Sequence, residues 1–178
     1  MAVDHVKSTG ITNSDASPAV ANTAGEIGGA APLKVVSSGS VVGVASSSQD
    51  ATYQFVRVPS NAKIQAMFFE SAAQAAGTMD IGVYYATDGV IGKPTALLAA
   101  AAIDQDFFAT LVALTSASGP TNIINESTTN TPAKRVQPLW QALGLTSDPG
   151  GNFDICGTVV TAITTGTGSM GMTVMYTD

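Results

Sequence analysis

Five segments of the chain are rich in aromatic and β-branched residues and are bounded by turn-forming residues, which is the pattern of β-strands. Three of them, TYQFVRV, AKIQAMFFESA and TMDIGVYYA, follow one another between residues 51 and 86. The other two, FDICGTVVTAI and SMGMTVMYT, lie near the end of the sequence and are joined by the loop TTGTG. Strands that follow one another after short turns favour an all-β fold built from antiparallel sheets.

The breaks between the first three segments contain residues suited to tight turns. Pro59 fixes φ and has no N–H for a strand ladder, and Ser60 and Asn61 favour turns. In residues 79–85, Met, Ile, Val and Tyr occupy the odd positions, so we expect one face of this strand to enter the core. We therefore predict an antiparallel β-sandwich, with a jelly roll as one candidate topology and two short helices in its crossovers.

The first short helix is expected after the third strand, in the alanine-rich run ALLAAAAIDQDFFATL. Asp104 is a candidate N-cap for a helix over residues 105–114. Within it, Phe107, Leu111 and Leu114 have helical spacing and would pack on the rim of a sheet. Residues 115–131 then form a polar loop, which is either without fixed structure or used for contacts.

The second short helix is expected in the stretch PLWQALGLTSDPGGNFDI. Pro138 suits the first helical turn, and Gly144 suits the position after the last one. Leu139, Trp140 and Leu143 form an apolar stripe between them. The pattern predicts a helix of two turns, with Trp140 as an anchor in the core.

Two carboxylates in the same stretch raise the question of a metal site. Asp148 precedes Pro149 and Gly150, which suit the two central positions of a type II turn that needs no ion. Asp154 follows this turn. A calcium loop normally supplies several more oxygen ligands at regular spacing, so we expect no metal site here.

The residues needed for nucleophilic catalysis are also missing. The single histidine, His5, has no Cys or His neighbours, so it can support neither a catalytic triad in the domain nor a metal site. The single cysteine, Cys156, cannot form an internal disulfide and has no basic neighbour in sequence, which predicts an inert thiol.

The remaining acidic residues and glycines have structural explanations. Asp80 alternates with core residues on a strand, and Asp104 and Asp106 suit the start of the expected helix. The sequence contains neither a P-loop motif nor a G-x-G-x-x-G motif between a strand and a helix. We therefore expect no catalytic, cofactor-binding or metal-binding residues, and a protein that is not an enzyme.

Charged residues are scarce, at 11% of the chain against about 25% in an average soluble domain. A surface so poor in charge indicates an assembly component whose neighbours cover much of it. The net charge of −6, with only 7 Lys and Arg residues, disfavours binding to nucleic acid. The start MAVDHVKSTG lacks the apolar run of a secretory signal, and the longest apolar run, residues 96–103, is too short to span a bilayer. We expect synthesis in a cytoplasm and no membrane segment.

Residues 1–39 are expected to form an extended or flexible arm, and residues 40–178 a single β-sandwich domain. The arm consists mainly of Ser, Thr, Ala, Gly and Asn, and it has almost no large apolar residues to offset the entropy of its own folding. We expect this arm to be an assembly element that becomes ordered only against a partner.

Four motifs occur in an order that resembles a group of small virion proteins of tailed bacteriophages. They are FVRVPSNAKI, TMDIGVYYATDG, DQDFFATL and PLWQALGLTSDPGGNFDI, and the likeness covers residues 53–176. The shared pattern is a V-P-x-N-A-x-I strand corner, a D-I-G-V-Y strand, an aspartate-led short helix with paired aromatics, and P-L-W-x-x-L-G-x-x-x-D-P-G-G-x-[FY]-D. Members of this group are identified as head decoration or cement proteins. The resemblance implies a structural role on a virion and carries over no catalytic residue.

These observations favour a capsid decoration protein that bridges capsid subunits on the shell exterior through many small contacts. Its partners would be the major capsid protein and further copies of itself, with a trimer as the favoured state. One alternative is a tail or head-fibre component. Another is a carbohydrate-binding β-sandwich, which would need exposed aromatics beside polar groups, whereas most aromatics here fall in strands or on apolar helix faces.

Overall fold

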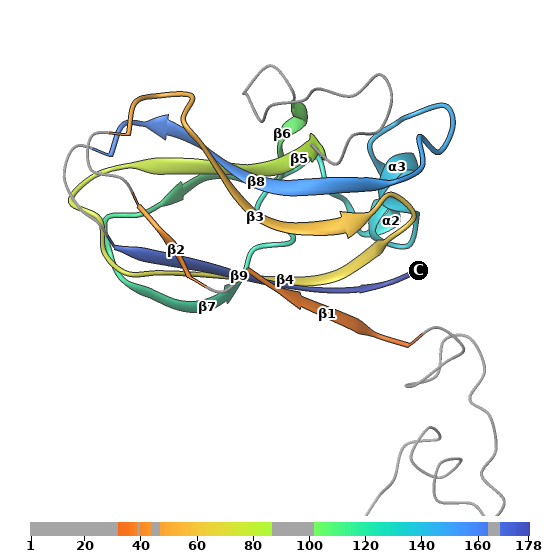
Figure 1. Ribbon diagram of the computed structural model, residues 1–178, viewed down its shortest axis with the longest axis horizontal. Helices are drawn as coiled ribbons and strands as arrows, with labels where there is room; N and C mark the ends of the chain where they lie inside the picture. The colour runs from red at the N-terminus through yellow and green to blue at the C-terminus, as the bar shows by residue number, and fades with distance from the viewer. Residues whose placement is uncertain (1–31, 39, 44–46, 87–101, 164–167) are drawn as a thin grey trace, which may run out of the picture.

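The computed structural model describes residues 32–38, 40–43, 47–86, 102–163 and 168–178, which fold as two antiparallel β-sheets packed face to face (Figure 1). The first sheet contains β1 (Lys34–Ser37), β2 (Val41–Val42), β4 (Lys63–Ser71), β7 (Ser118–Asn122) and β9 (Ser169–Thr177). The second contains β3 (Thr52–Pro59), β5 (Thr78–Tyr85), β6 (Ala102–Ala113) and β8 (Asn152–Thr161). Two single-turn helices, α2 (Pro132–Arg135) and α3 (Leu139–Ala142), lie in the crossover from β7 to β8.

The strand order is that of a jelly roll. The first sheet has the order β1-β9-β4-β7, with β2 also paired to β9, and the second has the order β3-β8-β5-β6. From β2 to β9 the chain crosses to the other sheet at every connection except the one between β5 and β6. Such alternation produces the two Greek keys of a jelly roll. The predicted all-β antiparallel sandwich is confirmed, and so are the five strands expected from the sequence.

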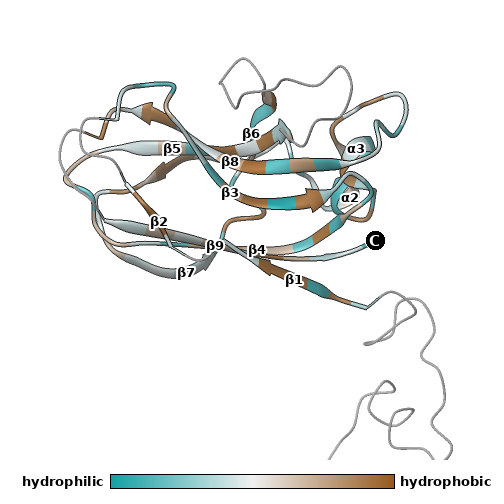
Figure 2. Ribbon diagram, viewed as in Figure 1, coloured by the Kyte–Doolittle hydropathy of each residue, from teal (hydrophilic) through white to brown (hydrophobic). Residues whose placement is uncertain are grey.

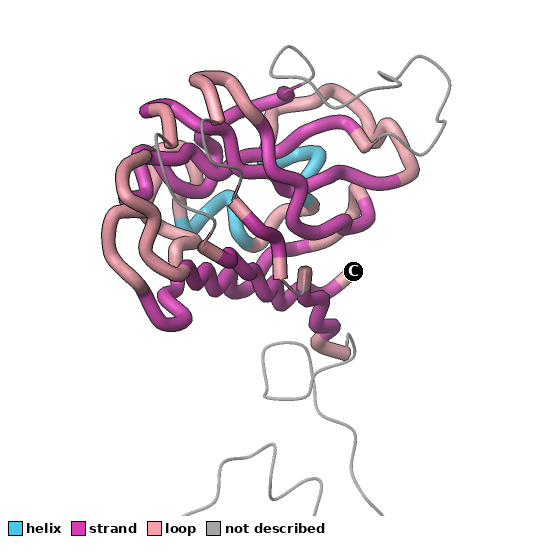
Figure 3. The backbone as a smooth tube through the Cα atoms, turned by 60° about the vertical axis from the view of Figure 1, so that its left-hand side comes forward, coloured by secondary structure: helices cyan, strands magenta, loops and turns pink. Residues whose placement is uncertain are grey.

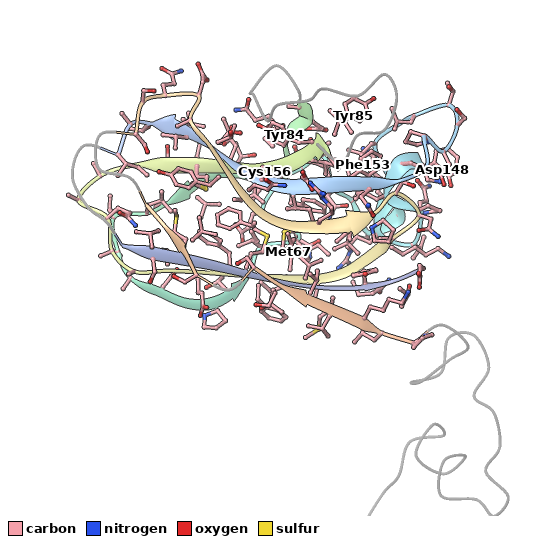
Figure 4. The ribbon with its side chains drawn as sticks, viewed as in Figure 1. Met67, Tyr84, Tyr85, Asp148, Phe153 and Cys156 are labelled. Atoms are coloured by element: carbon pink, nitrogen blue, oxygen red, sulfur yellow. The ribbon has the colours of Figure 1, made fainter. Side chains whose placement is uncertain are left out.

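The core lies between the two sheets and consists of side chains from alternate strand positions. Met67 and Phe69 enter it from β4, and Ile81 and Ile155 enter it from the opposite sheet; all four are at most 2% exposed. Met67 lies between the two layers in Figure 4. The alternation expected for residues 79–85 is also confirmed, because Met79, Ile81 and Val83 share this core.

The helix expected over residues 105–114 is wrong, because Ala102–Ala113 form β6, which pairs antiparallel with β5. Asp104 is therefore a strand residue and not an N-cap. Without β6, the N–H and C=O groups along one edge of β5 would be buried without hydrogen-bond partners. The free energy gained by pairing them outweighs the helical preference of alanine. The new strand is irregular: its register against β5 shifts three times, and Leu111 has a φ of 54°.

The second expected helix is present but shorter than predicted. α3 has a single turn, Pro138 is its N-cap, and Gly144 follows its end with the expected positive φ of 78°. Leu139 and Ala142 are the residues that it buries, whereas Trp140 is half-buried at the margin of the core. Figure 3 shows both helical turns in cyan against the strands.

Two parts of the chain that we expected to be irregular contain strands. The polar segment 115–131 includes β7, which pairs with β4 at the edge of the first sheet. The expected arm includes β1, whose four residues pair with Thr173–Tyr176 of β9 without a register shift. Residues 1–31, and His5 with them, lie outside the described residues, and the division of the chain at residue 39 stays a prediction.

Candidate functional site

Asp148 closes the turn in which it lies. Its Oδ1 accepts hydrogen bonds from the Ser60 hydroxyl at 2.6 Å and from the backbone N–H of Gly150 at 2.8 Å. Gly150 and Gly151 have φ values of 68° and 71°, which glycine adopts without strain. The carboxylate therefore holds the loop after α3 against the β3–β4 corner (Figure 4).

Asp154 has a different environment, on the face of β8 that points away from the core. Its fully buried carboxylate accepts hydrogen bonds from Arg57 Nε at 2.6 Å, Arg57 Nη2 at 3.0 Å and Gln54 Nε2 at 2.6 Å. Gln54 and Arg57 are three residues apart on β3, where a regular strand would point them to opposite faces. A register shift between Gln54 and Val56 turns both toward Asp154.

Each of these two carboxylates has its own protein donors. Among the described residues, no group of three or more His, Cys, Asp or Glu side chains is placed to hold a metal ion. Asp148 thus stabilises the β3–β4 corner, and Asp154 stabilises the pairing of β3 with β8.

Cys156 and Tyr84 are fully buried next to each other (Figure 4). Because Tyr84 pairs with Asp154, two residues before Cys156 on β8, all three lie on the same face of the second sheet. Burial raises the pKa of the Cys156 thiol, and the nearby charge of Asp154 raises it further. Burial also raises the pKa of the Tyr84 hydroxyl, which is hydrogen-bonded to Thr158. A nucleophilic cysteine needs a lowered pKa and access to solvent, and this thiol has neither.

The acidic residues around β6 support the irregular course of that strand. Asp80 Oδ1 accepts a hydrogen bond from the backbone N–H of Leu111 at 2.8 Å, and its Oδ2 accepts one from Gln105 Nε2 at 3.3 Å. Asp104 and Asp106 form a hydrogen-bonded carboxyl pair. Burial raises the pKa of Asp104, and Asp106 raises it further through this hydrogen bond and its negative charge.

Exposed apolar side chains form the surface feature that the sequence did not reveal. Leu33, Val35 and Val42 are 54%, 59% and 56% exposed, and they lie on or beside the edge strands β1 and β2. On the outer side of the first sheet, Val35 pairs with Met175, and Met175 pairs with Ala66. We call Val35, Met175 and Ala66 the apolar row; it crosses β1, β9 and β4. Figure 2 shows apolar residues in brown on β1 and β2.

Few charges interrupt the apolar row. The nearest cation along β1, Lys34, forms an ion pair with Asp178 at 2.5 Å, so its charge is matched within the chain. On one side, the neighbouring cross-strand row is Ser37, Thr173 and Phe68, in which only Phe68 is large. On the other side, Lys63 pairs with Thr177. An apolar row with so few charges around it is suited to protein contacts.

A groove lies at the opposite edge of the sandwich, between β6 and β7. It has a volume of about 320 Å³, and its lining includes Phe69, Leu111, Val112, Thr121, Ile123 and Glu126. A second hollow of about 340 Å³ is lined mainly by small polar residues around Ser71 and Ser118, with Glu70 as its one titratable side chain.

In the part of the chain that the structure describes, no helix is long and apolar enough to cross a membrane.

No protein-family model matches the chain, and no curated protein matches it. Among solved structures, the chain is similar to one in the structure described as "Cyanophage Pam1 capsid asymmetric unit". The two sequences are 17% identical, the TM-score is 0.48, and the alignment covers 92% of this chain and 96% of the other.

Proposed function

We propose that the protein is a non-enzymatic structural component of a bacteriophage virion, which decorates the capsid and stabilises it by bridging neighbouring capsid subunits. The observation that carries this proposal is the apolar row of Val35, Met175 and Ala66 on the outside of the jelly roll. The buried carboxylates and the buried thiol all serve the fold, so the surface of the domain is left for contacts.

The apolar row is a physically sound docking surface. Burying exposed apolar area contributes roughly 25 cal/mol for each Å² removed from water. β1 is a short edge strand with regular pairing to β9, and within the described residues its outer N–H and C=O groups face no further strand of the sheet. Such an edge can accept an extended segment of another protein, which gains backbone hydrogen bonds in addition to apolar contact.

The sequence motifs support the same role, because they resemble those of phage head decoration proteins over residues 53–176. The partners are then the major capsid protein and further copies of this chain, with a trimer as the favoured state. The protein is made in the host cytoplasm and is added to the outside of the shell. Many weak contacts of this kind hold a decoration protein firmly without high affinity at each site.

The carbohydrate-binding alternative finds no support in the positions of the aromatic side chains. Sugar-binding sites use aromatic rings that face solvent, whereas every Phe, Tyr and Trp of this chain is buried or half-buried. A tail or head-fibre component would differ from a capsid decoration protein only in its binding partner. A binding experiment therefore distinguishes the two.

The test is binding of the purified protein to phage heads that lack it, compared with binding to isolated tails, followed by cryo-electron microscopy of the decorated particle. Val35→Asp should weaken binding to heads at least about tenfold, because a charge would be buried in the contact. Ser147→Asp adds the same charge to an exposed loop outside the row and should bind as the unmodified protein does. Binding to tails and not to heads would overturn the capsid assignment.

A further inference from the structure

The groove between β6 and β7 exposes residues that belong to the core. Phe69 and Ile123 are only 2% and 3% exposed overall, yet both contribute to its wall. Leu111 stands at the rim with 54% of its surface exposed. Glu126 is the one charged residue in the lining. The groove is thus a nearly neutral, mostly apolar slot at the edge where the two sheets separate.

Leu111 is held in an unfavourable backbone conformation. Its φ of 54° lies in the left-handed region, which costs a residue with a Cβ about 1–2 kcal/mol. The hydrogen bond from its N–H to the buried Asp80 carboxylate fixes this conformation. Strain that the surrounding structure maintains, and that leaves a large apolar side chain in solvent, is a mark of a contact site.

Neither strand beside the groove is suited to adding another strand to its sheet. β7 contains Pro120, which cannot donate a hydrogen bond to a ladder. β6 is irregular along its length, as its register shifts against β5 show. An occupant of the groove must therefore be held mainly by side-chain contacts, which favours an extended segment with small and medium-sized side chains.

Residues 1–31 have the small and medium-sized side chains that suit the groove, and they are connected to the domain at the opposite edge. Residues 1–31 contain no Phe, Tyr or Trp, and their larger aliphatic residues are isolated. They are Val3, Val6, Ile11, Val20 and Ile27. This segment joins the domain at β1, and β1 and β3 form the edge of the sandwich opposite β6 and β7 (Figure 1).

We propose that residues 1–31 of one copy occupy the β6–β7 groove of a neighbouring copy. A donor at one edge and an acceptor at the opposite edge make a head-to-tail contact, which closes into a ring when the rotation between copies allows it. This inference deepens the self-association in the proposed function and names the surface that carries it.

The segment is long enough for this contact. A flexible chain of this length has a root-mean-square span of about 30 Å, and its full extension is about 100 Å. A compact domain of this size has a radius of gyration of about 15 Å, so a neighbour's groove lies within reach.

Cysteine cross-linking tests the proposal on the full-length protein, because the buried Cys156 leaves no reactive thiol in the domain. One preparation carries Thr121→Cys in the groove, and a second carries a single cysteine in place of Val6, Ile11, Val20 or Ile27. A short bis-maleimide should join the two preparations when they are mixed, at one or more of these positions. Ser147→Cys, in a loop that does not line the groove, is the matched control. Cross-linking to Thr121→Cys no stronger than to Ser147→Cys overturns the proposal. A third preparation carries Thr121→Cys and one of the N-terminal cysteines on the same chain. Linkage that forms only within this doubly substituted chain, at a rate independent of dilution, also overturns the proposal.

A second experiment measures self-association by sedimentation and uses no capsids, so its outcome is independent of the proposed capsid partner. Deletion of residues 2–31 and Thr121→Arg should each weaken association at least about tenfold, and combining them should add little, because both remove one contact. Ser147→Arg should leave association unchanged. Thermal unfolding verifies that each variant is folded. Association that survives both the deletion and Thr121→Arg overturns the groove assignment, even if the protein binds heads.

Discussion

The guanidinium of Arg57 and the carboxylate of Asp154 form a two-point ion pair across β3 and β8, with Nε–Oδ1 and Nη2–Oδ2 distances of 2.6 Å and 3.0 Å. The two residues are direct partners in the strand register. The carboxylate is fully buried, whereas 38% of the Arg57 side chain is exposed. The arginine therefore compensates the charge of the Asp154 carboxylate, whose burial without a partner would be strongly unfavourable.

Removing the arginine should cost more than removing both charges. Arg57→Ala leaves Asp154 buried with only Gln54 as its side-chain donor, and we expect it to lower the free energy of unfolding by about 2–3 kcal/mol. Arg57→Ala combined with Asp154→Ala should recover part of this loss. Urea denaturation of the single and double variants measures both effects. Equal stability of Arg57→Ala and the unmodified protein would show that the pair contributes nothing.

Gly82 should tolerate no side chain. A Cβ at this position would lie 2.2 Å from the carbonyl oxygens of Asp104 and Gln105, which are backbone atoms of the irregular part of β6. We expect Gly82→Ala to destabilise the fold by at least about 3 kcal/mol. Gly119→Ala is the matched control, because no atom lies within 4 Å of its added Cβ, and it should change stability by less than about 0.5 kcal/mol. Similar unfolding curves for the two variants would contradict the close approach of β6 to β5.

At position 111, glycine should be more stable than alanine. Both substitutions remove the leucine side chain, but only glycine relieves the strain of the positive φ. We expect Leu111→Gly to exceed Leu111→Ala by about 1 kcal/mol in the free energy of unfolding. The neighbouring residue Val112 should show the ordinary order, with Val112→Ala more stable than Val112→Gly. The same order at both positions would mean that Leu111 is not strained.

Asp104 should make the protein more stable in mild acid. Burial, the hydrogen bond with Asp106 and the charge of Asp106 raise its folded-state pKa above the ordinary value of 3.8. The folded protein then holds the proton more tightly than the unfolded chain does. This contribution is fully present below the unfolded pKa and is lost as the pH rises through the folded pKa. Asp104→Asn should be more stable than the unmodified protein at pH 7, and its advantage should shrink toward pH 4. An advantage that does not depend on pH would contradict the raised pKa.

Leu139 should matter more for stability than Trp140. Leu139 is 2% exposed, whereas Trp140 is half-buried at the margin of the core. Leu139→Ala should therefore cost about 3–4 kcal/mol, and Trp140→Ala about 2 kcal/mol. Chemical denaturation, with tryptophan fluorescence for Leu139→Ala and circular dichroism for both, provides the comparison. A larger loss for Trp140→Ala would restore the indole as the main anchor, as the sequence pattern predicted.

The strands recognised from sequence are those whose side chains carry the pattern of a buried face. β5 and β8 have both faces buried and are rich in apolar residues, and β4 and β9 alternate between core and surface. In these elements the local preference for strand and the burial in the folded protein agree, so the strands can be recognised from the sequence.

The elements that were missed owe their structure to their neighbours. β7 has the sequence SGPTN, which no propensity scale favours, and it is a strand because it pairs with β4. β6 combines an alanine-rich approach with Phe and Leu at helical spacing, and the unpaired edge of β5 decides its conformation. Its shifts of register allow the consecutive residues Phe107 and Phe108 both to be buried, which a regular strand with one buried face does not.

The absence of catalytic residues remains a prediction from the sequence, whereas the apolar row and the groove could not be foreseen. Val35 lies in a segment whose composition predicts an arm too polar to build a core, and the spacing of Leu111 predicts a helix on the rim of a sheet. Exposure of these side chains depends on which strand ends at an edge, and that follows from the strand order. A single sequence does not contain this order in any local pattern.

The junction between the N-terminal segment and the domain has a mechanical consequence. β1 is only four residues long, it pairs with one strand of its sheet, and the segment enters it at Lys34, next to the Lys34–Asp178 ion pair. A pull on residues 1–31 that is directed away from the sheet loads the hydrogen bonds of β1 one after another, from Lys34 toward Ser37. Under such a load, β1 separates from β9 before the longer strands behind it in the sheet separate from one another. If residues 1–31 carry an attachment, as we propose, a load on that attachment would detach β1 first and leave the two packed sheets of the domain folded.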